Sequence, residues 1–233
     1  MRSPFKYFNS SPEVIRLAVM LYVRYPLSLR NVEDLLAERG IDICHETVRL
    51  WWNRFGPLFA ADIRRRRVQL RRGSPEWRWH LDEVFVKING VTHYLWRAVD
   101  HESEVLEAVA TKHRDQRAAL KFLKKLMKRY GRPRAVVTDK LRSYGAAMRV
   151  IGNVRRQECT GRRINNRAES SHQPFRRRER AMLRFRRMQT LQKFVSVHGI
   201  VYNHFNLERH LTNRQTYKRN RSAAMAAWQL LMA

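Results

Sequence analysis

The beginning of the chain places apolar residues at the three- and four-residue intervals of amphipathic helices. Ser10 and Glu13 have the spacing of a capping box at the start of the first helix, and Ser28 can cap a second. Gly40 suits the C-terminal end of that second helix. A third segment, HETVRLWWNRF, has one largely polar face and one apolar face, which carries Val48, Trp51, Trp52 and Phe55. We therefore predict three short helices in residues 11–56.

Two short helices, a tight turn and a third helix with a polar outward face form the pattern of a helix-turn-helix unit. An ordinary three-helix packing unit is the alternative interpretation. The position of this unit at the front of a very basic chain favours DNA binding, and we assign residues 1–60 to an all-α helix-turn-helix domain. The candidate DNA contacts on the third helix are Glu46, Thr47, Arg49, Asn53 and Arg54.

From residue 77 the pattern changes to the two-residue period of β-strands. One face of the first strand carries Asp82, Val84, Val86 and Ile88. The other face carries Leu81, Glu83, Phe85 and Lys87. Asn89-Gly90 is a strong signal for a hairpin turn, and the segments THYLWRAVD and EVLEAVAT follow as the second and third strands.

Residues 114–130 return to helical spacing, and residues 134–139, RAVVTD, form a short apolar run suited to a buried parallel strand. The order is therefore strand, strand, strand, helix, strand. The apolar stripe of residues 191–205 predicts a helix used in core or dimer packing. After the first domain we predict a basic linker at 61–76, a catalytic domain at 77–187 and a C-terminal helical extension at 188–233.

The 233 residues include 48 Lys and Arg against 20 Asp and Glu, a formal balance of +28. Such an excess points to a polyanion, most often nucleic acid, bound partly through the release of counterions. The two cysteines have no C-x-x-C spacing, so neither a disulfide framework nor a structural zinc site is expected. No apolar run approaches the roughly 20 residues that span a bilayer, and the N-terminus has no apolar signal core. We therefore expect a cytoplasmic protein with no membrane partner.

Three carboxylates stand out by their positions. Asp82 lies within a strand among apolar neighbours, where an acidic group is costly unless it is paired or metal-bound. Asp139 ends the fourth strand, and Glu169 lies where Asn165 or Asn166 can cap a helix. If the first and fourth strands are adjacent, Asp82 and Asp139 lie side by side. A following helix could then bring Glu169 to them.

Each of these carboxylates also has a purely structural interpretation. An Asp at a strand end, such as Asp139, is usually a turn or cap residue. Glu83 becomes the inward residue if the strand register slips by one position. Glu169 alone cannot be told from a surface carboxylate that pairs with Arg167 or Arg176. The prediction of a site therefore rests on the three acids together.

Clustered carboxylates repel one another, so such a group is expected only around a cation. Hard oxygen ligands select Mg²⁺ or Mn²⁺, which complete their shells with water and substrate phosphate. Two such ions about 3.5–4 Å apart can stabilise the attacking and leaving oxygens of a phosphoryl displacement. In a chain whose positive charge would hold DNA, a few acids would hold the metals that act on it.

Other residues could join this site or hold DNA beside it. His172 lies one helical turn after Glu169 and could contact a phosphate or orient water, although a solvent-facing histidine is the alternative. The residues that follow the fourth strand and could grip the DNA backbone are Lys140, Arg142 and Tyr144. The segment FRRRERAMLRFRR is expected to contact phosphates rather than form only a solvated cationic face, and its first arginines are Arg176, Arg177 and Arg178.

Three segments of the chain resemble the acidic blocks of bacterial insertion-sequence transposases of the DDE type. They are HLDEVFVKINGVTHYLWRAVD, VVTDKLRSYGAA and NNRAESSHQPFRRRERAMLRF. The similarity is strongest to the insertion sequence six family, whose helix-turn-helix resembles ERGIDICHETVRLWWNRF. This resemblance implies a ribonuclease-H-like catalytic domain, an α/β fold with a mixed sheet and flanking helices. It implies that Asp82, Asp139 and Glu169 form the metal-binding triad. It also implies a bacterial, nucleoid-associated protein that recognises terminal inverted repeats as a homodimer or larger assembly.

On this basis we expect a DNA transposase, an enzyme that carries out metal-dependent 3′-end cleavage and strand transfer on double-stranded DNA. The main alternative is a non-catalytic DNA-binding protein, either a regulator or a decayed transposase, since the charge and the helix-turn-helix suit both. A structure-selective nuclease of the same fold is a further alternative, but it would not need the N-terminal reader. Asp139 and Glu169 are 30 positions apart, a few fewer than the resemblance implies, and this interval bears on whether the enzyme is active.

Overall fold

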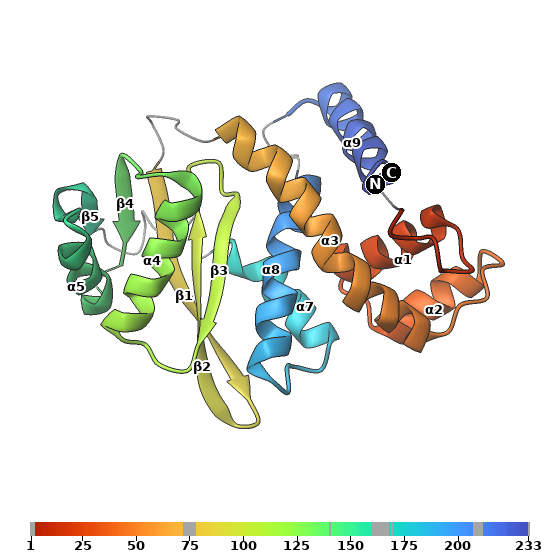
Figure 1. Cartoon of the computed structure of the whole chain (residues 1–233), viewed down its shortest axis with the longest axis horizontal. Helices are drawn as coiled ribbons and strands as arrows, with labels where there is room; N and C mark the ends of the chain where they lie inside the picture. The colour runs from red at the N-terminus through yellow and green to blue at the C-terminus, as the bar shows by residue number, and fades with distance from the viewer. Residues whose placement is uncertain are drawn as a thin grey trace.

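A five-stranded mixed sheet lies in one half of the protein, and the N-terminal helices lie in the other (Figure 1). The computed structural model describes residues 3–71, 78–139, 141–159, 168, 170–206 and 212–232. The strands are β1 (Arg78–Ile88), β2 (Val91–Val99), β3 (Val105–Thr111), β4 (Ala135–Thr138) and β5 (Gln157–Cys159). They lie in the order β3-β2-β1-β4-β5; β1 to β3 are antiparallel, β4 is parallel to β1, and β5 is parallel to β4. This arrangement confirms the mixed, ribonuclease-H-like sheet.

The β1–β2 hairpin forms as the sequence predicts. Asn89 and Gly90 have positive φ angles of 50° and 80°, as a two-residue turn of this type requires. From this turn the pairing extends until Asp82 lies opposite Arg97. Because successive strand residues point to opposite faces, Asp82 and Glu83 face different sides of the sheet.

Helices cover both faces of the sheet. On one face, α4 (Gln116–Tyr130) and α5 (Arg142–Ile151) pack against Trp79 and Leu81. On the other, α8 (Met188–Phe205) packs against β3 and shares a core with Val84 and Val86, while α3 (His45–Arg71) packs on α8. The apolar stripe predicted in residues 191–205 is buried in this core, which confirms core packing for it.

The first two helices begin and end close to the predicted positions. α1 (Pro12–Arg24) is capped by Ser11, whose side chain accepts a hydrogen bond from the Val14 amide, so the predicted cap at Ser10 is wrong by one residue. Pro12 then occupies the first helical position, where its missing N–H is not needed. Ser28 caps α2 (Leu29–Ala37), as predicted, and it also forms a reciprocal capping box with Asn31.

Helix α3 continues through the first part of the predicted linker. The sequence predicts a linker in residues 61–76, but α3 ends only at Arg71. Ile63 is buried, and the Asp62 carboxylate pairs with Arg65 and Arg66 at 2.7 and 2.9 Å. These pairs have the three- and four-residue spacing that stabilises helices, so the linker prediction is wrong for this part. The rest of the segment lies outside the described residues.

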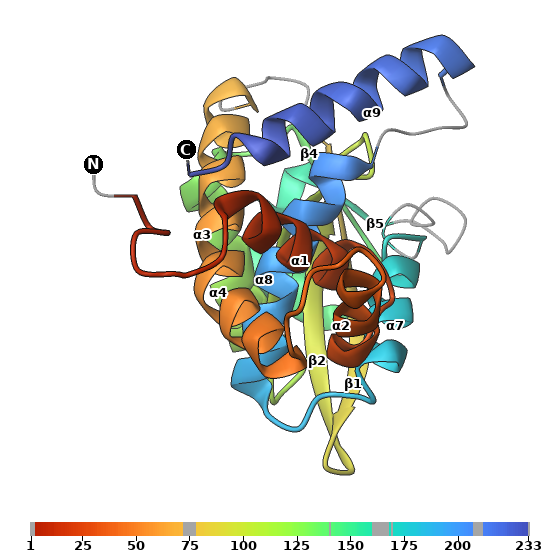
Figure 2. The same cartoon turned by 90° about the vertical axis from the view of Figure 1, so that its right-hand side faces the viewer.

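The C-terminal part of the chain folds back over the N-terminal helices (Figure 2). In α9 (Arg214–Gln229), Trp228 Nε1 donates to the Arg16 carbonyl at 3.1 Å, and Arg16 Nε donates to the Leu231 carbonyl at 2.8 Å. One apolar core therefore joins the N-terminal helices, α8, α9 and one face of the sheet, across the domain boundaries predicted at residues 60 and 187. No helix in the described part of the chain is long and apolar enough to cross a membrane.

Candidate active site

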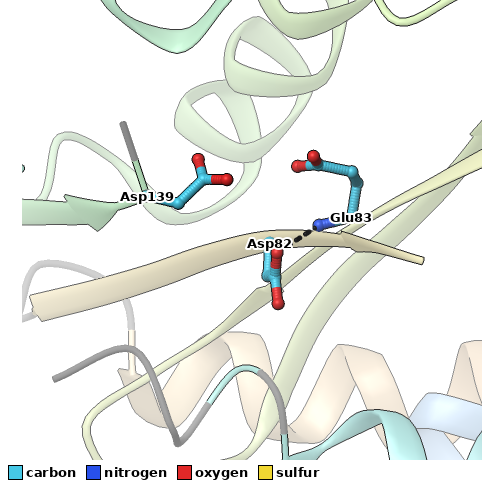
Figure 3. Close-up of side chains that lie close together, drawn as sticks. All are labelled: Asp82, Glu83 and Asp139. Carbon is cyan, nitrogen blue, oxygen red and sulfur yellow. Dashed lines mark hydrogen bonds between the residues drawn. The ribbon is translucent and has the colours of Figure 1, made fainter. Parts of the chain in front are cut away.

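Two of the three predicted acids meet where β1 and β4 run in parallel. The pairing ends with His80 opposite Val137, so Asp139 follows the end of β4 at the level of Asp82. Carboxylate oxygens of Asp82, Glu83 and Asp139 lie within 4.8 Å of one another (Figure 3). The predicted adjacency of Asp82 and Asp139 is therefore present. Glu169 lies outside the described residues.

Glu83 is the third acid of this cluster, and it points to the opposite side of β1 from Asp82 (Figure 3). Its side chain is buried and forms an ion pair with Arg114, and the Tyr144 hydroxyl donates to it at 3.4 Å. Burial raises the pKa of Glu83, an effect that Arg114 opposes and Asp139 reinforces. Glu83 is thus held by protein partners rather than being open to a ligand.

Arg114 connects the two acids on this side of the strand. Besides its pair with Glu83, its Nη2 lies 3.9 Å from Asp139 Oδ2. Sequence reasoning did not find Arg114, because its position depends on the loop between β3 and α4. The guanidinium balances part of the negative charge that would otherwise make the cluster repulsive.

On the other side of β1, His172 at the start of α7 (His172–Ala181) lies beside Asp82. Its Nε2 is 3.7 Å from Asp82 Oδ2 and has no hydrogen-bond partner among the residues that the structure describes. Burial, reinforced by the charges of Arg97 and Arg176, lowers the pKa of His172 to about 3. The ring is therefore neutral near pH 7, and it faces the acids rather than solvent.

Arg97 ties the segment before α7 to the sheet. This residue of β2 lies opposite Asp82, is 2% exposed, and donates from Nη2 to the Ser171 carbonyl at 2.9 Å. Burial lowers the pKa of Arg97 to about 10, and Asp82 partly opposes that decrease. Ala168 is also buried, against Val99 and Val105. Residues 168 and 171, on either side of position 169, are therefore anchored to β2 and β3, and β2 pairs with β1, the strand that carries Asp82.

The residues predicted to read DNA lie on the outer side of α3, where Thr47 is half-buried and the exposed ones are Glu46, Arg49, Asn53 and Arg54. Arg49 pairs with Glu46 at 2.8 Å, and Lys193 Nζ donates to Asn53 Oδ1 at 2.8 Å. Lys193 Nζ also donates to the Asn53 carbonyl. In a regular helix this carbonyl would accept a hydrogen bond from the backbone N–H of residue 57, but that residue is a proline and has no N–H. Asn53 therefore also joins α3 to α8.

The arginines of α7 differ in exposure. Arg177 is exposed and Arg176 is half-buried, but Arg178 is 1% exposed, so its predicted contact with DNA is wrong. Arg178 Nη1 donates to the Leu27 carbonyl at 2.7 Å, and burial lowers the pKa of Arg178 to about 10. Its guanidinium also lies over the Tyr22 ring, 5.0 Å from the ring centre. Arg178 therefore joins α7 to the N-terminal helices.

The residues after Asp139 also divide into exposed and buried. Arg142 begins α5 and is exposed, as a contact with the DNA backbone requires. Tyr144 is fully buried among the side chains of α4 and β2, so its predicted contact with DNA is wrong. Lys140 lies outside the described residues.

The chemistry of the acid cluster fits a hard divalent cation. Asp82 and Asp139 supply carboxylate oxygens, the ligands that Mg²⁺ and Mn²⁺ prefer. The only protein cation near Asp139 in the described part of the chain, Arg114, approaches it no closer than 3.9 Å. Asp82 and Asp139 turn to different sides of β1, but their carboxylate oxygens lie within 4.8 Å of each other (Figure 3). Because Glu83 is already paired with Arg114, these two are the described residues that would hold such an ion.

Comparisons with known protein sequences agree with this arrangement. Residues 76–208 match a family model described as a DDE domain. The chain is 34% identical over 172 residues to the transposase for insertion sequence-like element IS431mec of Staphylococcus aureus, covering 72% of this chain and 75% of that protein. It is 33% identical, with the same coverage, to the transposase for insertion sequence element IS257 in transposon Tn4003 of Staphylococcus aureus. A looser similarity links 62% of the chain to 58% of a chain in a simian T-cell lymphotropic virus intasome, with 16% identity and a TM-score of 0.43.

Proposed function

Because this chain belongs to the DDE transposases of the insertion sequence six family, we propose that it binds the terminal inverted repeats of an insertion sequence, cleaves the 3′ end of the element and joins that end to target DNA. The observation that carries the proposal is the parallel pairing of β1 with β4, which brings Asp82 and Asp139 together. An exclusively DNA-binding regulator would not need an acid pair in a chain of formal charge +28.

Asp82, Asp139 and Glu169 are the residues that would hold Mg²⁺ or Mn²⁺. The assignment of Glu169 is supported by Ala168 and Ser171, which contact β2 and β3 on the side of the sheet next to β1. When bound, the ions supply activation of the attacking oxygen and stabilisation of the leaving oxygen. The three carboxylates act as ligands and do not carry protons.

Two displacements at phosphorus follow one another at this site. First, a water oxygen bonds to phosphorus at the end of the element, and the bond from phosphorus to the 3′ oxygen breaks. The freed 3′ hydroxyl then attacks a target phosphodiester, and a target 3′ oxygen leaves. Neither step needs a covalent bond between protein and DNA. His172, which is neutral and lies beside Asp82, would hydrogen-bond the attacking water or the scissile phosphate.

DNA would be held on both sides of this site. Arg49, Arg54 and their neighbours Glu46, Thr47 and Asn53 lie on the outer side of α3 and would read the sequence of the element end. The backbone contacts would come from Lys140, Arg142, Arg176 and Arg177. Since an element has two ends, we propose a homodimer that holds both.

A strand-transfer assay with the DNA ends of the element and Mg²⁺ tests this function. We expect Asp82→Asn, Asp139→Asn and Glu169→Gln each to abolish joining while end binding in a gel-shift assay remains. Glu102→Gln, an exposed acid in the turn between β2 and β3, is the matched control and should join normally. Normal joining by any of the first three variants removes that residue from the mechanism. A wild-type chain that binds ends but joins nothing with Mg²⁺ or Mn²⁺ would support the regulator instead.

A further inference from the structure

A groove opens where β1 extends beyond its partner β4. The last β1–β4 pair is His80 with Val137, so the later residues of β1 have no strand on that side in the described part of the chain, and α7 lies beside them (Figure 2). Arg176 Nη2 donates to the Phe85 carbonyl at 2.5 Å, which fixes α7 to this edge. The groove has a volume of about 740 Å³, and its lining includes Phe85, Lys87, Arg176, Arg180, Leu183 and Arg184.

The charge of this groove is positive. Lys87, Arg176, Arg180 and Arg184 contribute four cations, and the one acid in the lining, Glu179, is buried and pairs with Arg176 at 2.5 Å. Lys87, Arg180 and Arg184 are exposed. Such a surface suits phosphate groups.

Two large apolar side chains project into the same surface. Phe85 is 50% exposed and Leu183 is 90% exposed. Leu183 and Arg184 have φ angles of 54° and 72°, the left-handed conformation that helix ends normally give to glycine. Backbone bonds from Leu183 to the Arg180 carbonyl and from Arg184 to the Glu179 carbonyl maintain this turn. A leucine is therefore held outward in a conformation that is unfavourable for it, which is typical of ligand contacts.

The groove adjoins the acid cluster. Phe85 lies on the same face of β1 as Glu83, two residues further along, or about 7 Å at the rise of a strand. The Arg114 guanidinium centre is 5.4 Å from the centre of the Phe85 ring, and its Nη2 is 3.9 Å from Asp139 Oδ2. A DNA strand whose phosphate lay at Asp139 would thus bring its neighbouring nucleotide to Phe85.

We propose that this groove binds a nucleotide unstacked from the duplex beside the bond that is cut, and this inference rests on the proposed function. The base packs on Phe85 and Leu183, and its phosphates contact Lys87, Arg180 and Arg184. An aromatic platform within a cationic groove is the chemistry by which proteins bind single-stranded nucleic acid. An apolar side chain such as Leu183 can also enter between base pairs and separate them.

Fluorescence anisotropy in EDTA tests the proposal without any catalysis. The probes are a short blunt duplex and the same duplex with a single-stranded 3′ extension. We expect the full chain to prefer the extended duplex by about fivefold or more, the effect of stacking one base on an aromatic ring. Phe85→Ala and Leu183→Ala should lose that preference, while Val150→Ala and Leu230→Ala, which also shorten exposed apolar side chains, should keep it.

Leu183→Gly separates binding from folding. Glycine relieves the left-handed backbone, so this variant should keep or raise the melting temperature while losing the preference for the extended duplex. Photocross-linking from 5-iododeoxyuridine in the extension should map to Phe85 or its neighbours. Equal affinity of the wild-type chain for both probes would overturn the proposal, and so would an unchanged preference in Phe85→Ala.

Asp139→Asn distinguishes failure of this proposal from failure of the proposed function. This variant should retain the preference for the extended duplex while joining no DNA. If the wild-type chain joins ends but shows no preference, only the groove proposal fails. If it shows the preference, lost in Phe85→Ala, but never joins ends, the groove stands and the transposase reaction fails.

Discussion

Replacement of Arg97 by methionine should abolish strand transfer while leaving the protein almost as stable as before. Methionine has a similar length but no charge and no donor. The change removes the bond from Arg97 Nη2 to the Ser171 carbonyl, together with two longer contacts at 3.4 Å to the Ser171 hydroxyl. That hydroxyl keeps a partner, since it donates to the Ala168 carbonyl at 2.6 Å.

Two opposing terms set the expected change in the free energy of unfolding. A charge-assisted bond to a carbonyl contributes about 1.5–3 kcal/mol, which the variant loses. Against this, burial lowers the pKa of Arg97 from 12.5 to about 10. Each unit of pKa corresponds to about 1.4 kcal/mol, so keeping the buried side chain charged destabilises the folded state by roughly 3 kcal/mol. The variant loses this penalty as well. The two terms therefore cancel to within about 2 kcal/mol, as for other buried charges.

Urea unfolding, gel-shift and strand-transfer assays on the same preparation test this reasoning. Arg178→Met is the matched control, because Arg178 is equally buried, has a pKa of about 10 and also donates to a backbone carbonyl, but it lies away from the acids. Arg178→Met should join DNA, and Arg97→Met should bind ends without joining them. Joining at the wild-type rate by Arg97→Met would refute the positioning role. A loss of more than about 3 kcal/mol would refute the cancellation.

Three further changes have defined outcomes. Glu83→Gln releases Arg114 toward Asp139, so joining should require roughly 10–100-fold more Mg²⁺ in a titration. Burial lowers the pKa of His198 to about 3. Below about pH 6.5 this histidine therefore binds a proton in the unfolded chain but not in the folded protein. The free energy of unfolding should therefore decrease as the pH is lowered from about 6.5 to 3, and it should decrease less steeply in His198→Phe. Urea unfolding at a series of pH values measures this difference. Arg49→Ala should weaken binding to element ends more than to random DNA, whereas Arg177→Ala should weaken both equally in gel shifts.

The hairpin and the acid pair could be predicted because they depend on local signals. The Asn89-Gly90 turn fixes the register of β1 and β2, and the two-residue period assigns each side chain to a face. The same register places Arg97 opposite Asp82, so this partner was present in the sequence as a signal that we did not use. Arg114 could not be found in this way, because a loop rather than a strand pairing brings it to Glu83.

Two incorrect predictions, the DNA contact of Arg178 and the linker after residue 60, came from judging arginine-rich segments by composition rather than by periodicity. Arg178 lies one helical turn after Phe175, which is fully buried, so helical spacing alone places it on the inner face of α7. Ile63 continues the buried stripe of α3 in the same way, which the surrounding arginines obscured. A buried arginine can remain charged when a backbone carbonyl accepts its hydrogen bond and an aromatic ring packs against its guanidinium. The Leu27 carbonyl and the Tyr22 ring do this for Arg178.

The convergence of the three acids is tested most directly by iron-directed cleavage of the protein backbone. Fe²⁺ replaces Mg²⁺ at such sites, and hydroxyl radicals generated there with ascorbate and peroxide cut the chain close to the metal. We predict cuts near Asp82, near Asp139 and within residues 168–172, all suppressed by excess Mg²⁺ and all lost in Asp139→Asn. Cuts near the first two acids, with none around position 169, would contradict the claim that Glu169 completes the site.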